Sequence, residues 1–254
     1  MAITLENFTV KGGYANGTTY PHSYGGGLSM QGPIDVYADD ITITIRDLIV
    51  RNNYSDGGGG GIFMSSKMNY YLYDTDVTDN SADSWGNGIY AGGYGTTYLS
   101  YVDLYRNTGP GSGMYINSAG TKTLSHCYFM DNAGTFVDSL YISKSNATYS
   151  ITYGGFYPNT KPAIGITVTG ATSLTISNVW FGGDPGNTSA AIYESQDISG
   201  HTITNNKFLV SYYGALYKEG STVTITDNAS GLALLNTANH TSHDASTASG
   251  NTIE

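Results

Sequence analysis

The chain reads Gly59-Gly60-Gly61-Ile62 and, 27 residues later, Gly86-Asn87-Gly88-Ile89, two copies of a small-residue cluster followed by an apolar residue. That apolar residue recurs at spacings of 27, 25, 26, 26, 26 and 24, at Ile62, Ile89, Met114, Leu140, Ile166, Ile192 and Leu216. An Asn or Asp marker recurs at spacings of 27, 27, 25, 27 and 25, at Asn53, Asn80, Asn107, Asn132, Asn159 and Asp184. Two unrelated markers that keep one period indicate an internal repeat.

The repeats are predicted to consist of strands. Apolar and polar residues alternate in Ile41-Thr42-Ile43-Thr44-Ile45 and in Leu174-Thr175-Ile176, which is typical of a strand. Each repeat holds too few strands for a sheet of its own, so its backbone groups must pair with the repeats before and after it. Stacking at about 4.8 Å per coil gives an all-β parallel β-helix of roughly eight or nine coils with a period near 26 residues. We expect this solenoid over residues 1–236, and a polar tail or last partial coil over 237–254.

Two columns of the predicted solenoid face inward. The first lies three residues before each marker and comprises Val50, Val77, Leu104, Phe129, Phe156 and Phe181. The second lies two residues further back and comprises Leu48, Thr75, Val102, Cys127, Gly154 and Val179. The single cysteine is therefore interpreted as a small core residue, and the markers as an asparagine ladder whose amides bond along the stack.

Composition excludes several classes of partner. Ten Lys and Arg against twenty Asp and Glu give a net charge of −10, which argues against nucleic acid and against anionic membrane surfaces. No apolar run approaches the roughly 20 residues of a transmembrane helix, so membrane insertion is not expected. The N-terminal stretch lacks the features of a signal peptide, so the sequence is either intracellular or part of a longer secreted chain.

The repeat resembles those of right-handed parallel β-helix, pectin-lyase-like proteins. The resemblance rests on the Gly-rich lead-ins together with Phe129-Met130-Asp131-Asn132 and Phe156-Tyr157-Pro158-Asn159, and it covers about residues 1–225. The closest likeness is to polymorphic outer-membrane and autotransporter passenger repeats, which implies an extracellular or cell-surface location. The fold hosts lyases, epimerases, adhesins and phage tail proteins, so the resemblance alone does not choose a function.

An outward aromatic column is the most regular surface feature that the repeat predicts. It follows each inward aliphatic residue and comprises Phe63, Tyr90, Tyr115, Tyr141, Thr167, Tyr193 and Tyr217. Two residues earlier lies a strip of small residues, from Gly61, Gly88 and Gly113 onward, which is expected on the same outer face. The aromatic residues are expected to form one exposed column, interrupted at Thr167. Its five tyrosines could bind sugar rings or a neighbouring protein, or they could simply stabilise the sheet.

Acidic residues form a second candidate site. Asp76 and Asp103 are expected on adjacent coils, with Asp47 and Asp74 in a neighbouring outward column. Two such carboxylates could bind Ca²⁺, which prefers oxygen ligands, or could be solvated turn charges. The resemblance to pectate-lyase-like β-helices implies that Asp76 and Asp103 would be calcium ligands and Arg106 the base that removes a proton from a uronate. The sequence His240-Thr241-Ser242-His243-Asp244 is interpreted as a tail turn rather than a metal site.

Three functions follow from these features. The leading hypothesis is a non-catalytic β-helical segment of a secreted, cell-surface or viral protein, which binds a polysaccharide or a cell-surface protein through the tyrosines. The alternatives are a calcium-assisted polysaccharide lyase and a structural spacer of a surface layer or fibre. Two structural expectations accompany them. Glu194 and Lys218 should form a salt bridge on adjacent coils, and the uncapped ends should associate end to end with neighbouring chains.

Overall fold

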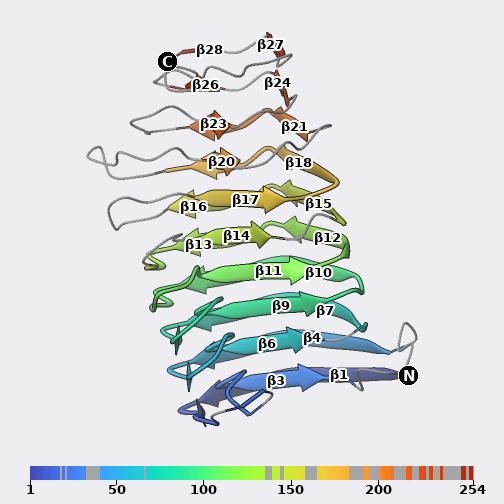
Figure 1. Ribbon diagram of the computed structural model, residues 1–254, viewed down its shortest axis with the longest axis vertical. Coiled ribbons are helices and arrows are strands. Elements are labelled where there is room, and N and C mark those ends of the chain that lie inside the picture. Colours follow the sequence, from blue (N-terminus) through green and yellow to red (C-terminus); the bar gives the residue numbers. More distant parts are fainter. Residues whose placement is uncertain are drawn as a thin grey trace.

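The computed structural model describes residues 1–17, 19–20, 22–32, 41–65, 67–134, 139–143, 146–157, 165–182, 192–194, 201–208, 216–218, 223–226, 229–230, 235–236, 247–249 and 252–253. All the regular elements of these residues are strands, stacked coil upon coil in one column (Figure 1). No helix in this described part is long and apolar enough to span a membrane.

The strands form three parallel sheets. The nine-stranded sheet contains β3 (Leu28–Gln31), β6 (Ile62–Ser65), β9 (Ile89–Gly93), β11 (Met114–Ser118), β14 (Leu140–Ser143), β17 (Ile166–Gly170), β20 (Ile192–Glu194), β23 (Leu216–Lys218) and β26 (Leu235–Asn236). The three-stranded sheet contains β2 (Tyr14–Ala15), β5 (Tyr54–Ser55) and β8 (Ser81–Ala82). Consecutive neighbours in each sheet come from consecutive coils, so the predicted all-β parallel β-solenoid is confirmed.

The sixteen-stranded sheet supplies two sides of each coil. It begins with four long strands, β1 (Ala2–Lys11), β4 (Thr42–Arg51), β7 (Asn69–Thr78) and β10 (Thr97–Tyr105). It then continues along two paths. One comprises β12 (Gly120–Ser125), β15 (Ala147–Thr152), β18 (Ser173–Ser177), β21 (His201–Thr204), β24 (Val223–Thr226) and β27 (Thr247–Ser249). The other comprises β13 (Tyr128–Met130), β16 (Gly155–Tyr157), β19 (Trp180–Phe181), β22 (Lys207–Phe208), β25 (Ala229–Ser230) and β28 (Thr252–Ile253).

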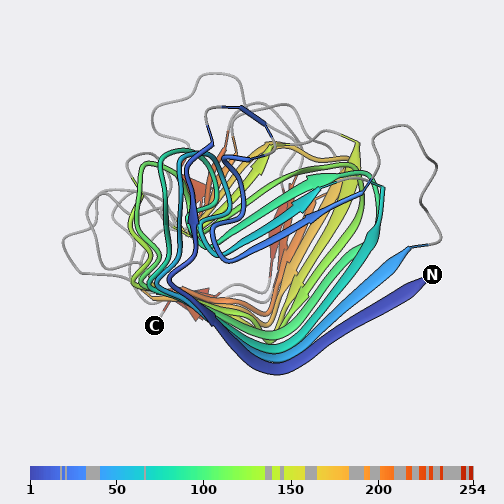
Figure 2. The ribbon, with the colours of Figure 1, turned by 90° about the horizontal axis from the view of Figure 1, so that it is seen from below.

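A corner in the left-handed region of φ separates these two sides, and Figure 2 shows the bend along the stack. The corner residues have φ between 46° and 60° and are Asn7, Asp47, Asp74, Tyr101, His126, Tyr153, Asn178 and Asn205. Asn and Asp tolerate this conformation best among residues with a Cβ. Asp47 and Asp74, which the sequence placed in an outward column, are therefore corner residues.

The two predicted inward columns are confirmed. The first column, from Val50 to Phe181, is at most 2% exposed, and the rings of Phe129, Phe156 and Phe181 stack at 4.7 and 5.3 Å. Cys127 is buried, and this burial raises the pKa of its thiol to about 12. The cysteine is therefore a core residue, because a thiol with such a pKa carries almost no thiolate at neutral pH.

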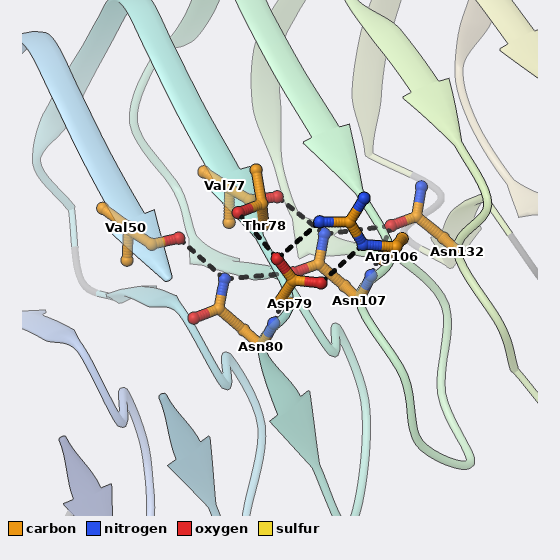
Figure 3. A network of polar contacts seen from close by, with 8 residues as sticks. All are labelled: Val50, Val77, Thr78, Asp79, Asn80, Arg106, Asn107 and Asn132. Atoms are coloured by element: carbon orange, nitrogen blue, oxygen red, sulfur yellow. Dashed lines mark hydrogen bonds and ion pairs between the residues drawn. The ribbon is translucent and has the colours of Figure 1, made fainter. Parts of the chain in front are cut away.

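The predicted asparagine ladder is also confirmed at its four described members, Asn53, Asn80, Asn107 and Asn132, of which Figure 3 shows the last three. The Nδ2 atom of Asn80 donates to Oδ1 of Asn107 at 3.0 Å, and Asn107 donates in turn to Asn132 at 2.9 Å. Each amide also donates to a backbone carbonyl, as Asn107 does to Val77 at 2.8 Å. The other two markers, Asn159 and Asp184, lie outside the described residues.

The predicted outer strip of small residues is wrong, because its glycines face this ladder from inside the coil. A Cβ on Gly61 would lie 2.9 Å from Nδ2 of Asn80, and one on Gly88 would lie 2.9 Å from Nδ2 of Asn107. Both glycines are buried. Small residues recur at this position because the ladder leaves no room for a side chain, and no surface trough results.

The last coils keep the predicted alignment where they are described. Glu194 and Lys218 are Cα partners on β20 and β23, but their side chains lie outside the described residues, so the salt bridge stays a prediction. Strands β27 and β28 pair with β24 and β25, while the sequence His240 to Asp244 is not described.

At the other end of the described stack, β1 pairs along one edge only, with β4. An apolar cavity of about 310 Å³ opens beside Met1, Ile3 and Met30. Neither feature tests whether chains associate end to end, so that association stays a prediction.

Candidate functional site

The aromatic column on the nine-stranded sheet has the predicted register. Phe63 is the Cα partner of Tyr90, Tyr90 of Tyr115, and Tyr115 of Tyr141. Beyond them, Thr167 pairs with Tyr193, and Tyr193 with Tyr217. The residues on either side of Phe63, Ile62 and Met64, belong to the hydrophobic core, whereas Phe63 and Tyr115 do not. The column therefore points outward from the coil.

The predicted exposure of this column is nevertheless wrong at two positions. Phe63 is only 2% exposed and Tyr115 only 8%. Other aromatic side chains cover them: the ring of Tyr24 lies 4.7 Å from that of Phe63, and the ring of Trp85 lies 5.1 Å from that of Tyr115. Tyr90, Tyr141 and Tyr193 are half-buried, and the side chain of Tyr217 is not described.

Rings in the column contact one another along the stack. Their centroids are 5.0 Å apart between Phe63 and Tyr90, 5.2 Å between Tyr90 and Tyr115, and 5.3 Å between Tyr115 and Tyr141. Burial raises the pKa of Tyr90 to about 12 and also raises that of Tyr115. The column is thus an outer aromatic layer that stabilises the sheet, and most of its ring faces are already in contact with protein.

Trp85 is the accessible part of this layer. Its ring stacks on Tyr115 at an interplanar angle of 25°, contacts Tyr141 at 5.5 Å, and is 38% exposed. Because one face rests on Tyr115, the exposed area belongs to the rest of the indole. A small cavity of about 180 Å³ adjoins it, lined by Asp83, Ser84, Trp85, Pro110 and Gly111.

The cavity has polar groups beside its aromatic wall. The exposed Asp83 stands one coil from Asp56, since its N–H donates to the carbonyl of the neighbouring Ser55 at 3.0 Å. The carboxylates of Asp83 and Asp56 lie close enough to the Tyr54 hydroxyl to raise its pKa. Carboxylate oxygens accept hydrogen bonds from hydroxyl groups, so the site combines an apolar ring face with hydrogen-bond acceptors. We call Trp85, Tyr141, Asp83, Ser84 and Pro110 the Trp85 platform.

Asp76 and Asp103 stand side by side as predicted, since they are Cα partners on β7 and β10. Asp76 is exposed and Asp103 half-buried. Burial, and then the neighbouring Asp76 carboxylate, raise the pKa of Asp103. Within the described residues no group of three or more His, Cys, Asp or Glu side chains could hold a metal ion. Two carboxylates fall short of the six to eight oxygen ligands that Ca²⁺ takes.

Arg106 is engaged elsewhere. Its Nε and Nη2 atoms donate to the two carboxylate oxygens of Asp79 at 2.6 and 2.8 Å (Figure 3). Its guanidinium lies 4.0 Å from the ring centroid of Tyr105. The hydrogen bonds with Asp79 raise the pKa of Arg106, and the same bonds lower the pKa of Asp79. A base must lose its proton, so this arrangement does not fit the role that the pectate-lyase resemblance implies for Arg106.

Comparison with known proteins bears on the fold. A family described as the right handed beta helix region matches residues 3–181, which is more than half of the chain. No curated protein and no solved structure matches the chain. The handedness of the predicted solenoid therefore rests on this family match.

Proposed function

The chain belongs to the right handed beta helix family, and from this premise we propose that it is a carbohydrate-binding, non-catalytic segment of a secreted or cell-surface protein. The Trp85 platform is the proposed binding site. The observation that carries the proposal is an exposed indole, held in place by Tyr115 beneath it, beside a cavity with the Asp83 carboxylate.

The chemistry of a sugar ring fits this arrangement. One face of the ring carries C–H groups that pack on an aromatic face, while its hydroxyls need hydrogen-bond partners. A rigid indole loses little conformational entropy on binding, because contacts with Tyr115 and Tyr141 already hold it. The net charge of −10 favours a neutral polysaccharide over an acidic one.

Electrophoresis through gels that contain a neutral polysaccharide tests the proposal. The probes are β-glucan, xylan, mannan and glycol chitin. Binding to a polysaccharide in the gel slows the migration of the protein. The substitution Trp85→Ala should weaken retention by roughly 10- to 30-fold, because it removes the central aromatic contact. Asp83→Ala should weaken retention less, because it removes hydrogen-bond acceptors at the rim of the site.

Tyr101→Ala is the matched control, because Tyr101 is 55% exposed and lies at the corner of the coil, in another column. It should leave retention unchanged. The proposal fails if no polysaccharide retards the protein, or if Trp85→Ala and Tyr101→Ala behave alike. Release of unsaturated uronides from polygalacturonate would instead support the lyase alternative.

A further inference from the structure

A second group of exposed aromatic side chains lies on another side of the solenoid. It is carried by β13, β16 and β19, where the Cα partners Tyr128, Gly155 and Trp180 follow one another on successive coils. Trp180 is 49% exposed and Tyr128 is 38% exposed, although both belong to well-paired strands. This column lies outside the aromatic layer of the nine-stranded sheet, so Trp180 has no part in the Trp85 platform.

Glycines shape this surface. A Cβ on Gly155 would lie 2.5 Å from Cε2 of Tyr157, and a Cβ on Gly182 would lie 2.5 Å from Cδ1 of the same ring. The Tyr157 ring thus occupies the space above both glycines. A Cβ on Gly155 would also lie 3.1 Å from Cδ1 of Tyr128, and Gly155 is the Cα partner of Trp180, so the three aromatic residues share one surface. Burial against the sheet raises the pKa of Tyr157. The Tyr157 side chain is only half-buried, so part of it remains accessible.

Charged residues stand at the two ends of the same column. Asp103 is the Cα partner of Tyr128, and Lys207 is the Cα partner of Trp180. The Lys207 ammonium lies 5.5 Å from the centroid of the indole, a cation–π contact that steadies the ring. Four coil steps of about 4.8 Å separate Asp103 from Lys207, so the column is roughly 19 Å long.

We propose that Tyr128, Tyr157 and Trp180 form a second saccharide-binding surface, which takes a linear oligosaccharide lying parallel to the solenoid axis. Alternate sugar rings would pack on Tyr128 and Trp180, which are two coils apart, and on the ring of Tyr157 between them. Asp103 accepts and Lys207 donates hydrogen bonds to hydroxyls at the two ends. This surface goes beyond the proposed function, because it gives one chain two independent sites on different sides.

Tryptophan fluorescence separates the two sites, since the chain has only two tryptophans, Trp85 and Trp180. The variant Trp85→Phe reports on Trp180 alone, and Trp180→Phe reports on Trp85 alone. Hexasaccharides of β-1,4-glucan, xylan, mannan and chitin serve as probes. In the Trp85→Phe background, at least one hexasaccharide should change the emission of Trp180 saturably. Adding Tyr157→Ala should weaken that titration by about tenfold.

Tyr153→Ala in the same background is the control, because Tyr153 is 53% exposed but lies at the corner of the coil. It should leave the titration unchanged. The inference is overturned if no hexasaccharide affects Trp180, or if Tyr157→Ala and Tyr153→Ala have equal effects. If a hexasaccharide changes the emission of Trp85 in Trp180→Phe but none changes the emission of Trp180 in Trp85→Phe, this inference alone is refuted. If only the emission of Trp180 changes, the Trp85 platform alone is refuted.

Discussion

Two columns of this solenoid obey the same period but differ in the sequence variation that they accept. The ladder inside the turn is asparagine at each described member, Asn53, Asn80, Asn107 and Asn132. The column outside the nine-stranded sheet contains phenylalanine, tyrosine and threonine at equivalent positions, namely Phe63, Tyr90, Tyr115, Tyr141, Thr167 and Tyr193. Both columns have one residue per coil and side chains in contact along the stack.

The difference shows what each kind of contact requires. An amide in the ladder must donate to one neighbouring coil and accept from the other, and only Asn or Gln has both groups on one planar unit. The shorter Asn matches the space that the neighbouring glycines leave. An outer side chain needs only apolar contact with its neighbours, which several residue types provide. Hydrogen bonding along a stack therefore restricts residue type more strictly than packing does.

Breaking the ladder should have the largest effect. Asn107→Ala removes an amide that bonds to Asn80, Asn132 and Val77, and it leaves several buried polar groups without partners. We expect the free energy of unfolding to fall by about 4–6 kcal/mol, measured by urea denaturation.

Asn146→Ala is the control for this substitution, because Asn146 is exposed. It should change the free energy of unfolding by less than about 0.5 kcal/mol. A loss below about 2 kcal/mol for Asn107→Ala would show that the ladder contributes little beyond ordinary turn hydrogen bonds.

A substitution in the outer column should cost less. Phe63→Ala removes a ring that is 2% exposed and contacts Tyr24 and Tyr90, and we expect a loss of about 3 kcal/mol. Tyr94→Ala, at a site that is 60% exposed, should cost under about 1 kcal/mol in the same denaturation experiment. If Phe63→Ala and Tyr94→Ala lowered the free energy of unfolding equally, the outer aromatic layer would not cover Phe63 in solution.

A third column, inside the coil, carries a lysine. Lys122 is 1% exposed, its Nζ donates to the carbonyl of Gly95, and burial lowers its pKa to about 8. A lowered pKa means that the unfolded chain binds more protons between pH 8 and the ordinary lysine value. Stability therefore rises with pH through that window and is lowest below it.

We expect the Lys122 contribution to be about 1 kcal/mol more favourable at pH 9 than at pH 7. The variant Lys122→Met should lack this dependence and be more stable than the wild type at pH 7. Urea denaturation of both proteins at the two pH values measures the difference. If the free energy of unfolding changed equally with pH in the wild type and in Lys122→Met, the Lys122 ammonium would be exposed to solvent.

The smallest effect on stability is expected at Thr167, which interrupts the aromatic column. Thr167 is 4% exposed, and its buried Oγ1 has no hydrogen-bond partner among the described residues. Thr167→Val keeps the shape and removes the hydroxyl, so we expect a gain of up to about 1 kcal/mol in the free energy of unfolding. A loss of similar size in thermal or urea denaturation would show that the hydroxyl is bonded in solution.

Much of the fold was predictable because its determinants are local and repeated. Alternation assigns Val50 and Phe129 to the core, and the period aligns Asn80 with Asn107. The same period also links Asp79 with Arg106, 27 residues apart, and could have predicted their ion pair. The register also placed Asp76 and Asp103 side by side, which was correct, whereas their role as calcium ligands came only from the resemblance.

The sequence by itself thus determined the coil, its inward columns and the outward direction of the aromatic column, because a strand puts alternate residues on opposite faces. Only the tertiary structure decided which outward side chains are accessible. Trp85 and Tyr24 cover Tyr115 and Phe63 from connections between strands. The period relates these two residues, since each lies four residues before the inward aliphatic residue of its coil, but alternation does not operate there and so gives no direction for their side chains. Direction is a property of the strand that carries a residue, whereas exposure depends on what the rest of the chain lays over it.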